Sequence, residues 1–260
     1  MKVLSVGDCH GSENPLKIAK KYQNIVDKII FHGDYVDSYT EDNNWPEQKE
    51  VLEKILEFKS KNESKVELLI GNHDIQYIGG TVASRRQFKY EDQIRDFFFD
   101  NLDKFDVVSV IDDYIFSHAG VSLDWLNENQ LKLDQINKVF HNKNWGPFKF
   151  VGPNPSGDNK NESPMWIRPS SLMTSQIPGF NQVVGHTMVN YDEYFGLRAN
   201  VFSIRDLMHM NNGRIDNKRW DELADLVDNK IIIIDSMERD VYSLVETTNK
   251  LDYRLAKGIE

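Results

Sequence analysis

The sequence predicts an α/β protein built on a mainly parallel sheet. Three short apolar runs, at residues 3–6, 28–31 and 66–70, are expected to form buried strands. Segments with helical spacing of apolar residues separate these runs, a rhythm typical of parallel sheets with helices on their faces. Each run also ends in a glycine followed by polar residues. Because ligands of parallel sheets gather beyond the carboxyl ends of the strands, we expect these polar residues to share one rim.

Helices are expected between and after these strands. The first should begin with Asn14 as its N-cap and Pro15 at the first helical position, and continue to about residue 27 with Ile25 on its apolar face. The second is expected over residues 45–58 and a third over 91–102, from the spacing of their apolar residues. The second half is expected to contain strands over 107–111, 114–117, 197–204, 231–234 and 240–245, and short helices over 123–127, 134–140 and 220–227.

Length and charge restrict the class of protein. The chain has 260 residues, enough for one large α/β domain with a sizeable core, so we expect a single domain over residues 1–260. A hydrophobic share of 40% and a charged share of 28% are ordinary for a soluble globular protein. The net charge of −10, with no basic block, argues against an extensive nucleic-acid-binding surface but leaves a nucleotide substrate open.

The expected cellular compartment follows from the targeting and membrane signals that the sequence lacks. The chain enters its first strand within a few residues, so no signal peptide is expected. No apolar run reaches membrane-spanning length, so no membrane partner is expected. The single cysteine, Cys9, leaves no internal disulfide. We therefore expect a cytoplasmic protein.

Five glycine-containing motifs follow predicted strands. They are Gly7-Asp8-Cys9-His10-Gly11, Gly33-Asp34-Tyr35-Val36-Asp37, Gly71-Asn72-His73-Asp74, Ser117-His118-Ala119-Gly120 and Gly185-His186-Thr187. One such histidine alone is most often a hydrogen-bonded core or loop residue. Four of the chain's seven histidines fall in these motifs, and five coincident motifs on one rim indicate a shared site instead.

The donor types in these motifs indicate a metal centre. Carboxylate, amide and imidazole groups without thiolate suit a borderline divalent metal, with manganese favoured and iron, zinc or nickel as alternatives. Calcium and magnesium prefer sites made only of oxygen, which four histidines do not provide. The donors are too many for one ion, whereas two ions about 3.5–4 Å apart that share a bridging carboxylate would use them all.

In their order along the chain, the five motifs resemble those of the calcineurin-like metallophosphoesterase superfamily. The closest resemblance is to its phosphoprotein-phosphatase branch, which includes bacterial and phage serine/threonine phosphatases and symmetrical diadenosine tetraphosphatases. It covers residues 7 to about 187, with a weaker match at Asp235. The resemblance implies a four-layer α/β/β/α sandwich and hydrolysis of a phosphoric ester by a hydroxide that bridges two divalent ions.

The resemblance also implies a role for each residue. The expected metal ligands are Asp8 and His10 for the first ion, Asp34 as the bridge, and Asn72, His118 and His186 for the second. His73 would be the general acid that protonates the leaving oxygen, since a poor alkoxide leaving group needs a proton donor. Asp37 would hold His73 in orientation, as a carboxylate commonly does for a functional imidazole.

Two departures from the branch bear on the substrate. Protein phosphatases of this branch usually have a phosphate-binding arginine where this chain has Ser38, and the third motif ends in Asp74 where eukaryotic members have glutamate. Arg168, in a Trp-x-Arg stretch similar to a phosphate-contacting stretch of bacterial relatives, is the expected replacement for substrate binding. Arg85 and Arg86 are further candidates, although solvated or ion-paired side chains are the simpler expectation for both.

The sequence also gives expectations for residues 142–164, for Cys9 within the first motif and for His32 beside the second. The 142–164 segment is rich in asparagine, glycine and proline and includes Trp145 and Phe148, so it either covers a pocket or is a surface excursion anchored by its aromatic side chains. Cys9 and His32 are expected to point away from the metals, because alternate residues of an extended segment face opposite sides.

Three functions remain open at this point. The first is a phosphomonoesterase, possibly similar to serine/threonine protein phosphatases, acting on a phosphorylated protein or small molecule. The alternative is a nucleotidyl hydrolase that acts on diadenosine tetraphosphate or on terminal phosphates of nucleic acid. A metal-bound binding protein without turnover is the third, and the presence of every expected ligand and of His73 speaks against it.

Overall fold

The computed structural model describes residues 1–40, 43–149, 151 and 159–187, and three later strands at 201–203, 231–233 and 242–246. Within these residues the chain forms two five-stranded sheets. The first has the order β10 (Tyr242–Glu246), β1 (Lys2–Val6), β2 (Lys28–Phe31), β3 (Val66–Leu69) and β4 (Phe105–Asp106). The second has the order β5 (Val108–Ile111), β6 (Tyr114–Ser117), β7 (Asn181–Val184), β9 (Ile231–Ile233) and β8 (Val201–Ser203).

Most neighbouring strands are parallel, as the alternation of strand and helix predicted. β1 to β4 are parallel, and β10 closes the first sheet as an antiparallel partner of β1. In the second sheet β5 and β6 form an antiparallel hairpin, whereas β6, β7, β9 and β8 are parallel. The parallel strands of each sheet therefore end together, and the loops that leave them can meet.

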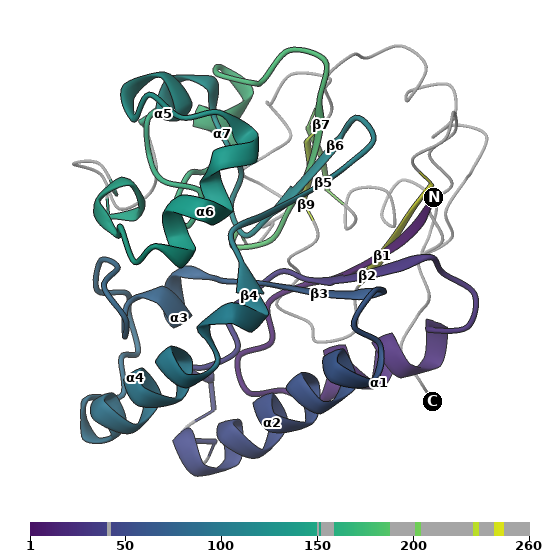
Figure 1. Cartoon of the computed structure of the whole chain (residues 1–260), viewed down its shortest axis with the longest axis vertical. Coiled ribbons are helices and arrows are strands. Elements are labelled where there is room, and N and C mark those ends of the chain that lie inside the picture. Colours follow the sequence, from purple (N-terminus) through teal and green to yellow (C-terminus); the bar gives the residue numbers. More distant parts are fainter. Residues whose placement is uncertain are drawn as a thin grey trace.

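Helices cover the outer side of each sheet (Figure 1). Those along the first sheet are α1 (Asn14–Tyr22), α2 (Trp45–Lys61) and α4 (Glu91–Asp100), and those beside the second are α5 (Leu123–Glu128), α6 (Ile136–His141) and α7 (Pro169–Met173). The short α3 (Asn72–Ile75) directly follows β3. This order of layers confirms the predicted α/β/β/α fold. No helix within the described residues is both long and apolar enough to cross a membrane.

The first sheet is covered on both faces. Val3, Leu4 and Val6 of β1 are at most 1% exposed, a burial pattern that requires material on either side of the strand. Leu4 and Val6 belong to the main apolar cluster together with Leu16 of α1. Ser5 lies between them in the sequence, and its hydroxyl contacts the buried imidazole of His32, with 3.2 Å between Oγ and Nε2.

His32 joins the two sheets. Its Nδ1 lies 2.9 Å from the main-chain oxygen of Ser117, at the end of β6. In return, Nδ1 of His118 lies 2.7 Å from the main-chain oxygen of His32. Burial lowers the pKa of His32 to about 3, so its ring is neutral and donates a single N–H, which the Ser117 oxygen accepts. His32 is thus a structural link, in agreement with the prediction that it points away from the metal site.

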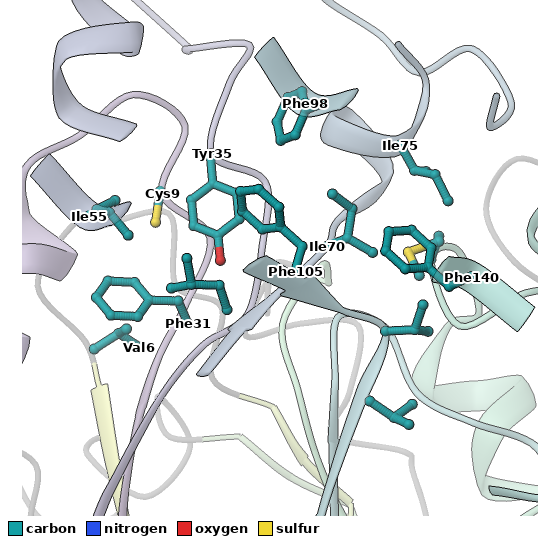
Figure 2. Close-up of a cluster of buried hydrophobic side chains, with 14 of the residues drawn as sticks. Val6, Cys9, Phe31, Tyr35, Ile55, Ile70, Ile75, Phe98, Phe105 and Phe140 are labelled. Atoms are coloured by element: carbon teal, nitrogen blue, oxygen red, sulfur yellow. The ribbon is translucent and has the colours of Figure 1, made fainter. Parts of the chain in front are cut away.

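Aromatic side chains fill the space between the first sheet and its helices (Figure 2). The ring of Phe105 lies 5.4 Å from that of Tyr35 and 5.5 Å from that of Phe98, centroid to centroid. Cys9 belongs to the same apolar cluster and is 2% exposed, in agreement with the expectation that it points away from the metals. Burial, together with nearby carboxylates, raises the pKa of its thiol well above the ordinary value.

Several predicted elements differ from those observed. The N-cap of α1 is Glu13 rather than Asn14, and the helix ends at Tyr22 instead of continuing to residue 27. Ile25 is 62% exposed and lies in a turn whose amide donates to the oxygen of Tyr22, so its apolar side chain did not extend the helix. The helix predicted over residues 220–227 lies outside the described residues.

The described part of the 142–164 segment is anchored by aromatic side chains. Phe148 is fully buried, with its ring 6.0 Å from that of Trp125 and 6.1 Å from that of Phe140. Trp145 packs edge-on against Phe140 at 5.4 Å. These contacts support the expectation of an anchored surface excursion for residues 142–149.

Leu52→Ala tests the packing of α2 against the first sheet. Leu52 is fully buried in the main apolar cluster, so the substitution should lower the free energy of unfolding by about 2–5 kcal/mol. Glu53→Ala removes only an exposed i,i+4 ion pair with Lys49 and should change it by less than about 0.5 kcal/mol. Urea unfolding followed by circular dichroism measures both, and equal losses would contradict the packing described.

Candidate active site

Five loops bring the predicted site residues to one rim. They leave the carboxyl ends of β1, β2 and β3 in the first sheet and of β6 and β7 in the second. The six predicted metal ligands lie on these loops: Asp8 and His10 after β1, Asp34 after β2, Asn72 after β3, His118 after β6 and His186 after β7. Residues up to 178 positions apart in sequence are hydrogen-bonded here, for example His186 to Asp8.

Four of the site residues have an unusual main chain. His10, Asp34, Asp37 and His186 have φ angles of 43°, 51°, 63° and 62°, in the left-handed region that side chains disfavour. Hydrogen bonds between the first two loops hold this conformation, including those from the amide of His10 to the oxygen of Asp34 (2.6 Å) and from Gly11 to Tyr35 (2.9 Å). Strain of this kind persists only where the surroundings enforce it, and it is concentrated at functional sites.

Asp34 lies at the centre of the cluster. One carboxylate oxygen, Oδ1, accepts a hydrogen bond of 2.9 Å from the amide of His73. The other oxygen, Oδ2, lies 3.6 Å from Nε2 of His10 and 3.5 Å from Nε2 of His118. Asp34 is 2% exposed, so this charge is held away from bulk water.

The hydrogen bonds of both histidines determine which nitrogen carries the proton. Nδ1 of His10 faces the main-chain oxygens of Val36 (3.2 Å) and Asp37 (3.1 Å), and Nδ1 of His118 faces that of His32. A carbonyl oxygen only accepts, so Nδ1 must be the donor in each ring. Burial is the main influence on both rings and lowers their pKa values, which favours the neutral form. Each Nε2 therefore directs a lone pair towards Oδ2 of Asp34.

The remaining predicted metal ligands lie beside these acceptors. The amide oxygen of Asn72 lies 2.8 Å from Nε2 of His118 and 3.0 Å from Nδ1 of His186. Asp8 accepts from the amide of His186 at 3.0 Å and lies 3.8 Å from Nδ1 of His118. Because the proton of His118 lies on Nδ1, its Nε2 turns a lone pair towards the Asn72 oxygen, and lone pairs at this distance repel unless a cation lies between them. The chemistry of the donor set thus fits divalent metal ions.

The donors form two groups that share one residue. One consists of Asp8, His10 and Asp34, and the other of Asp34, His118 and His186. In each group the candidate ligand atoms lie within 4.8 Å of one another. Asp34 is the shared member, in line with its expected bridging role.

His73 stands apart from these groups and is held by Asp37. Nδ1 of His73 lies 3.0 Å from Oδ2 of Asp37, whose side chain is fully buried. Burial alone would lower the pKa of His73, but the carboxylates of Asp34 and Asp37 outweigh it and raise that pKa above the ordinary value. With Nδ1 bonded to Asp37, Nε2 is the nitrogen that can present a proton to a ligand.

Three residues that sequence reasoning missed complete the surroundings of Asp37. Tyr77 donates its hydroxyl to Oδ1 (2.6 Å), Gln76 donates to Oδ2 (2.5 Å), and Gln87 donates to Oδ1 (3.1 Å). Gln76 and Tyr77 follow His73 by three and four positions, the spacing that places side chains on one face of a helical turn, so this signal was present in the sequence. Gln87 had no such signal.

Asp74 joins two of the loops. Its carboxylate accepts from the amides of Tyr35 (2.8 Å) and Gly71 (2.9 Å), so the second and third motifs are held together by a buried side chain. Asp74 thus has a structural role in the site, because it links the second and third motifs. Eukaryotic phosphatases have glutamate at this position.

The arginines have different surroundings. Arg168 donates from Nη1 to the main-chain oxygen of His186 (3.1 Å) and to the hydroxyl of Thr187 (3.2 Å), which places it beside the last motif. Arg86 forms an ion pair with Glu91 (2.6 Å), in agreement with the simpler expectation. Arg85 is exposed, and its Nη1 donates to the main-chain oxygen of Ser38 at 3.4 Å.

Glycines in two motifs leave room for carboxylates. A Cβ at Gly185 would collide with Oδ1 of Asp8, and a Cβ at Gly71 would collide with Oδ1 and the main-chain nitrogen of Asp34. Both carboxylates belong to the candidate metal groups. The absence of a side chain at these two positions is therefore a condition for the site geometry.

Gly71→Ala and Gly185→Ala test this condition without replacing any candidate ligand. Each should weaken binding of Mn²⁺ roughly 10–100-fold, because the methyl group displaces a carboxylate donor. Gly146→Ala is the matched control, since its Cβ would meet no atom closer than 3.5 Å. Calorimetric titration of the metal-free protein measures the affinity, and unchanged affinity in both site variants would refute the arrangement.

Comparison with known proteins agrees with this geometry. The family described as calcineurin-like phosphoesterase matches residues 1–190. Among solved structures, the chain is similar to a cold-active protein-tyrosine phosphatase of the psychrophile Shewanella sp., with 20% identity and a TM-score of 0.56 over 98% of this chain and 77% of that one. No curated protein matches the sequence.

Two further solved structures are more distant. A protein serine/threonine phosphatase from Saccharomyces cerevisiae has 15% identity and a TM-score of 0.43 over 73% of this chain and 62% of its own. A metallophosphoesterase from Sphaerobacter thermophilus has 17% identity and a TM-score of 0.39 over 72% and 60%. With the family match spanning most of its length, the chain belongs to the calcineurin-like phosphoesterases and is a phosphoric ester hydrolase.

Proposed function

We propose that this chain is a phosphomonoesterase that works with two divalent metal ions, preferably manganese. The observation that carries the proposal is the pair of imidazole lone pairs, from His10 and His118, that face the same carboxylate oxygen of Asp34. Asp8, His10 and Asp34 would hold one ion, and Asp34, Asn72, His118 and His186 the other. When bound, such ions acidify water into a nucleophile and offset charge on phosphoryl oxygens.

His73 is the proposed proton donor. Its Nε2 would protonate the leaving oxygen, while the hydrogen bond from Nδ1 to Asp37 fixes the ring and its tautomer. The raised pKa of His73 supports this role, because the carboxylates of Asp34 and Asp37 favour the protonated ring. Asp37 acts through His73 and is a positioning residue, itself held by Gln76, Tyr77 and Gln87.

Arg168 is the proposed partner of the transferred phosphoryl group. Its bonds to His186 and Thr187 hold the guanidinium beside the second group of ligands, where a phosphoryl oxygen would lie. We also propose that residues 1–260 form a single domain. In support of this, β10 completes the first sheet beside β1, and β8 and β9 complete the second beside β7.

A panel of phosphoesters tests the reaction type. With Mn²⁺ present, the chain should hydrolyse p-nitrophenyl phosphate and peptides phosphorylated on serine, threonine or tyrosine, the last included because a structurally similar protein is a protein-tyrosine phosphatase. Release of inorganic phosphate is the measurement. Turnover of diadenosine tetraphosphate alone would contradict the proposal and favour the nucleotidyl hydrolase. Absence of turnover on every substrate would favour a binding protein without catalytic activity.

Asp34→Asn tests the bridge. The substitution should lower the bound metal from about two ions per chain, because both groups lose their shared donor. Elemental analysis after gel filtration in Mn²⁺ gives the stoichiometry. His141→Asn is the control, since His141 is exposed and bonded to Asp106 away from the site. Full occupancy in Asp34→Asn would contradict the bridging role.

His73→Asn tests the proton donor. The kcat for an alkyl phosphate should fall about 10²–10⁴-fold, while the bound metal stays at the wild-type level. The loss for p-nitrophenyl phosphate should be much smaller, because p-nitrophenolate leaves without protonation. Equal losses for the two substrates would mean that His73 is not the acid.

A further inference from the structure

A line of contacts runs from the proposed proton donor to the protein surface. The ring of His10 lies 5.1 Å from that of His73 and 4.5 Å from that of Tyr39, centroid to centroid. Arg85 covers the ring of Tyr39, with 4.4 Å between its Cζ and the ring centroid. Tyr39 is 44% exposed and Arg85 is exposed, so the outer end of this line faces solvent beside the site.

Arg85 has no acidic partner among the described residues. Its guanidinium lies over the ring of Tyr39 and donates a 3.4 Å hydrogen bond to the main-chain oxygen of Ser38. Arg86 and Arg95, by contrast, form ion pairs of 2.6 Å and 2.7 Å with neighbouring carboxylates. In a protein with a net charge of −10, an exposed guanidinium that pairs with no carboxylate in the described part of the chain is suited to bind an anion at the edge of the site.

The segment that carries Arg85 is fixed to the catalytic surroundings. The amide of Ala83 donates to the side chain of Gln76 (3.0 Å), and Arg86 donates to the main-chain oxygen of Gln76 (2.7 Å). Gln87 donates to Asp37 through its side chain and to Tyr77 through its amide. Arg85 itself has a φ of 60°. The main chain around Arg85 is therefore held by Gln76, Tyr77 and Asp37, the residues that surround His73, while Tyr39 and Ser38 contact the guanidinium.

The contacts also indicate which part of the substrate Arg85 faces. His73 is the proposed proton donor to the leaving oxygen, so the leaving group of a bound substrate must lie next to His73. Tyr39 reaches that side through His10, and Val82 and Phe88, which are 59% and 74% exposed, flank Arg85 in the sequence. Exposed apolar side chains in the same short segment as a cation suit a peptide more than a polyphosphate.

We propose that Arg85, backed by Tyr39, binds a carboxylate in the leaving-group part of the substrate, and that the substrate is a phosphopeptide or phosphoprotein with an acidic residue next to the phosphorylated one. This inference rests on the proposed phosphomonoesterase function. The face of Tyr39 limits the mobility of the guanidinium, so less conformational entropy is lost on binding.

Paired phosphopeptides that differ only in Asp or Asn beside the phosphorylated residue test the proposal. The wild-type protein with Mn²⁺ should show a kcat/KM roughly 3–10-fold higher for the Asp peptide, and the ratio should shrink as salt is added. Arg85→Gln should bring the ratio close to one, and Arg85→Lys should keep part of it. Arg95→Gln is the matched control and should keep the wild-type ratio, since Arg95 is partly exposed and paired with Asp92.

Each outcome bears on one of the two proposals. A wild-type ratio of one, or an Arg85→Gln variant that keeps the wild-type ratio, overturns the inference. Equal loss on both peptides also overturns it, because Arg85 would then serve the transferred phosphoryl group or the fold. Hydrolysis of p-nitrophenyl phosphate by the wild-type protein supports the proposed function independently. Turnover of diadenosine tetraphosphate alone overturns both proposals.

Discussion

The carboxylate of Asp34 is the point on which the site depends. One oxygen is fixed by the amide of His73, which leaves the other facing two imidazole lone pairs. A buried arrangement of this kind is costly for the folded chain unless a cation offsets it. The cost explains features that look unrelated in the sequence. A glycine at position 71 leaves room for the carboxylate, and left-handed backbone at Asp34 aims it.

The stacking of the two sheets determines the chemistry of His118. Two hydrogen bonds join the sheets: the ring of His32 bonds to the main-chain oxygen of Ser117, and the ring of His118 bonds to the main-chain oxygen of His32. The second bond holds the proton of His118 on Nδ1. Nε2 is consequently left as an acceptor towards Asp34. The contact that joins the sheets is thus also the contact that leaves Nε2 of His118 free for the proposed metal ion, so fold and proposed site cannot be altered independently at this place.

Sequence patterns predicted the parts of this molecule that depend on local order. Strand, glycine and polar residue recur, and parallel topology then places the polar residues together. Local patterns failed in two ways. Ile25 continued the helical spacing, yet the helix ends at Tyr22 and Ile25 lies in the turn that follows. Gln87 contacts Asp37 across 50 positions, and Arg85 contacts Tyr39 across 46, distances over which no spacing rule applies.

The two roles that we propose, substrate recognition by Arg85 and proton donation by His73, depend on one set of hydrogen bonds. Gln87 and Gln76 contact Asp37 directly, and their main-chain neighbours position Arg85. An anion that engages Arg85 therefore restrains the segment whose side chains hold Asp37, and Asp37 in turn orients the ring of His73. Binding energy from the leaving group would then be spent on aligning the proton donor, which raises kcat rather than only lowering KM. Small substrates without that anion would lack this contribution, even though they would reach the same proposed metal ligands.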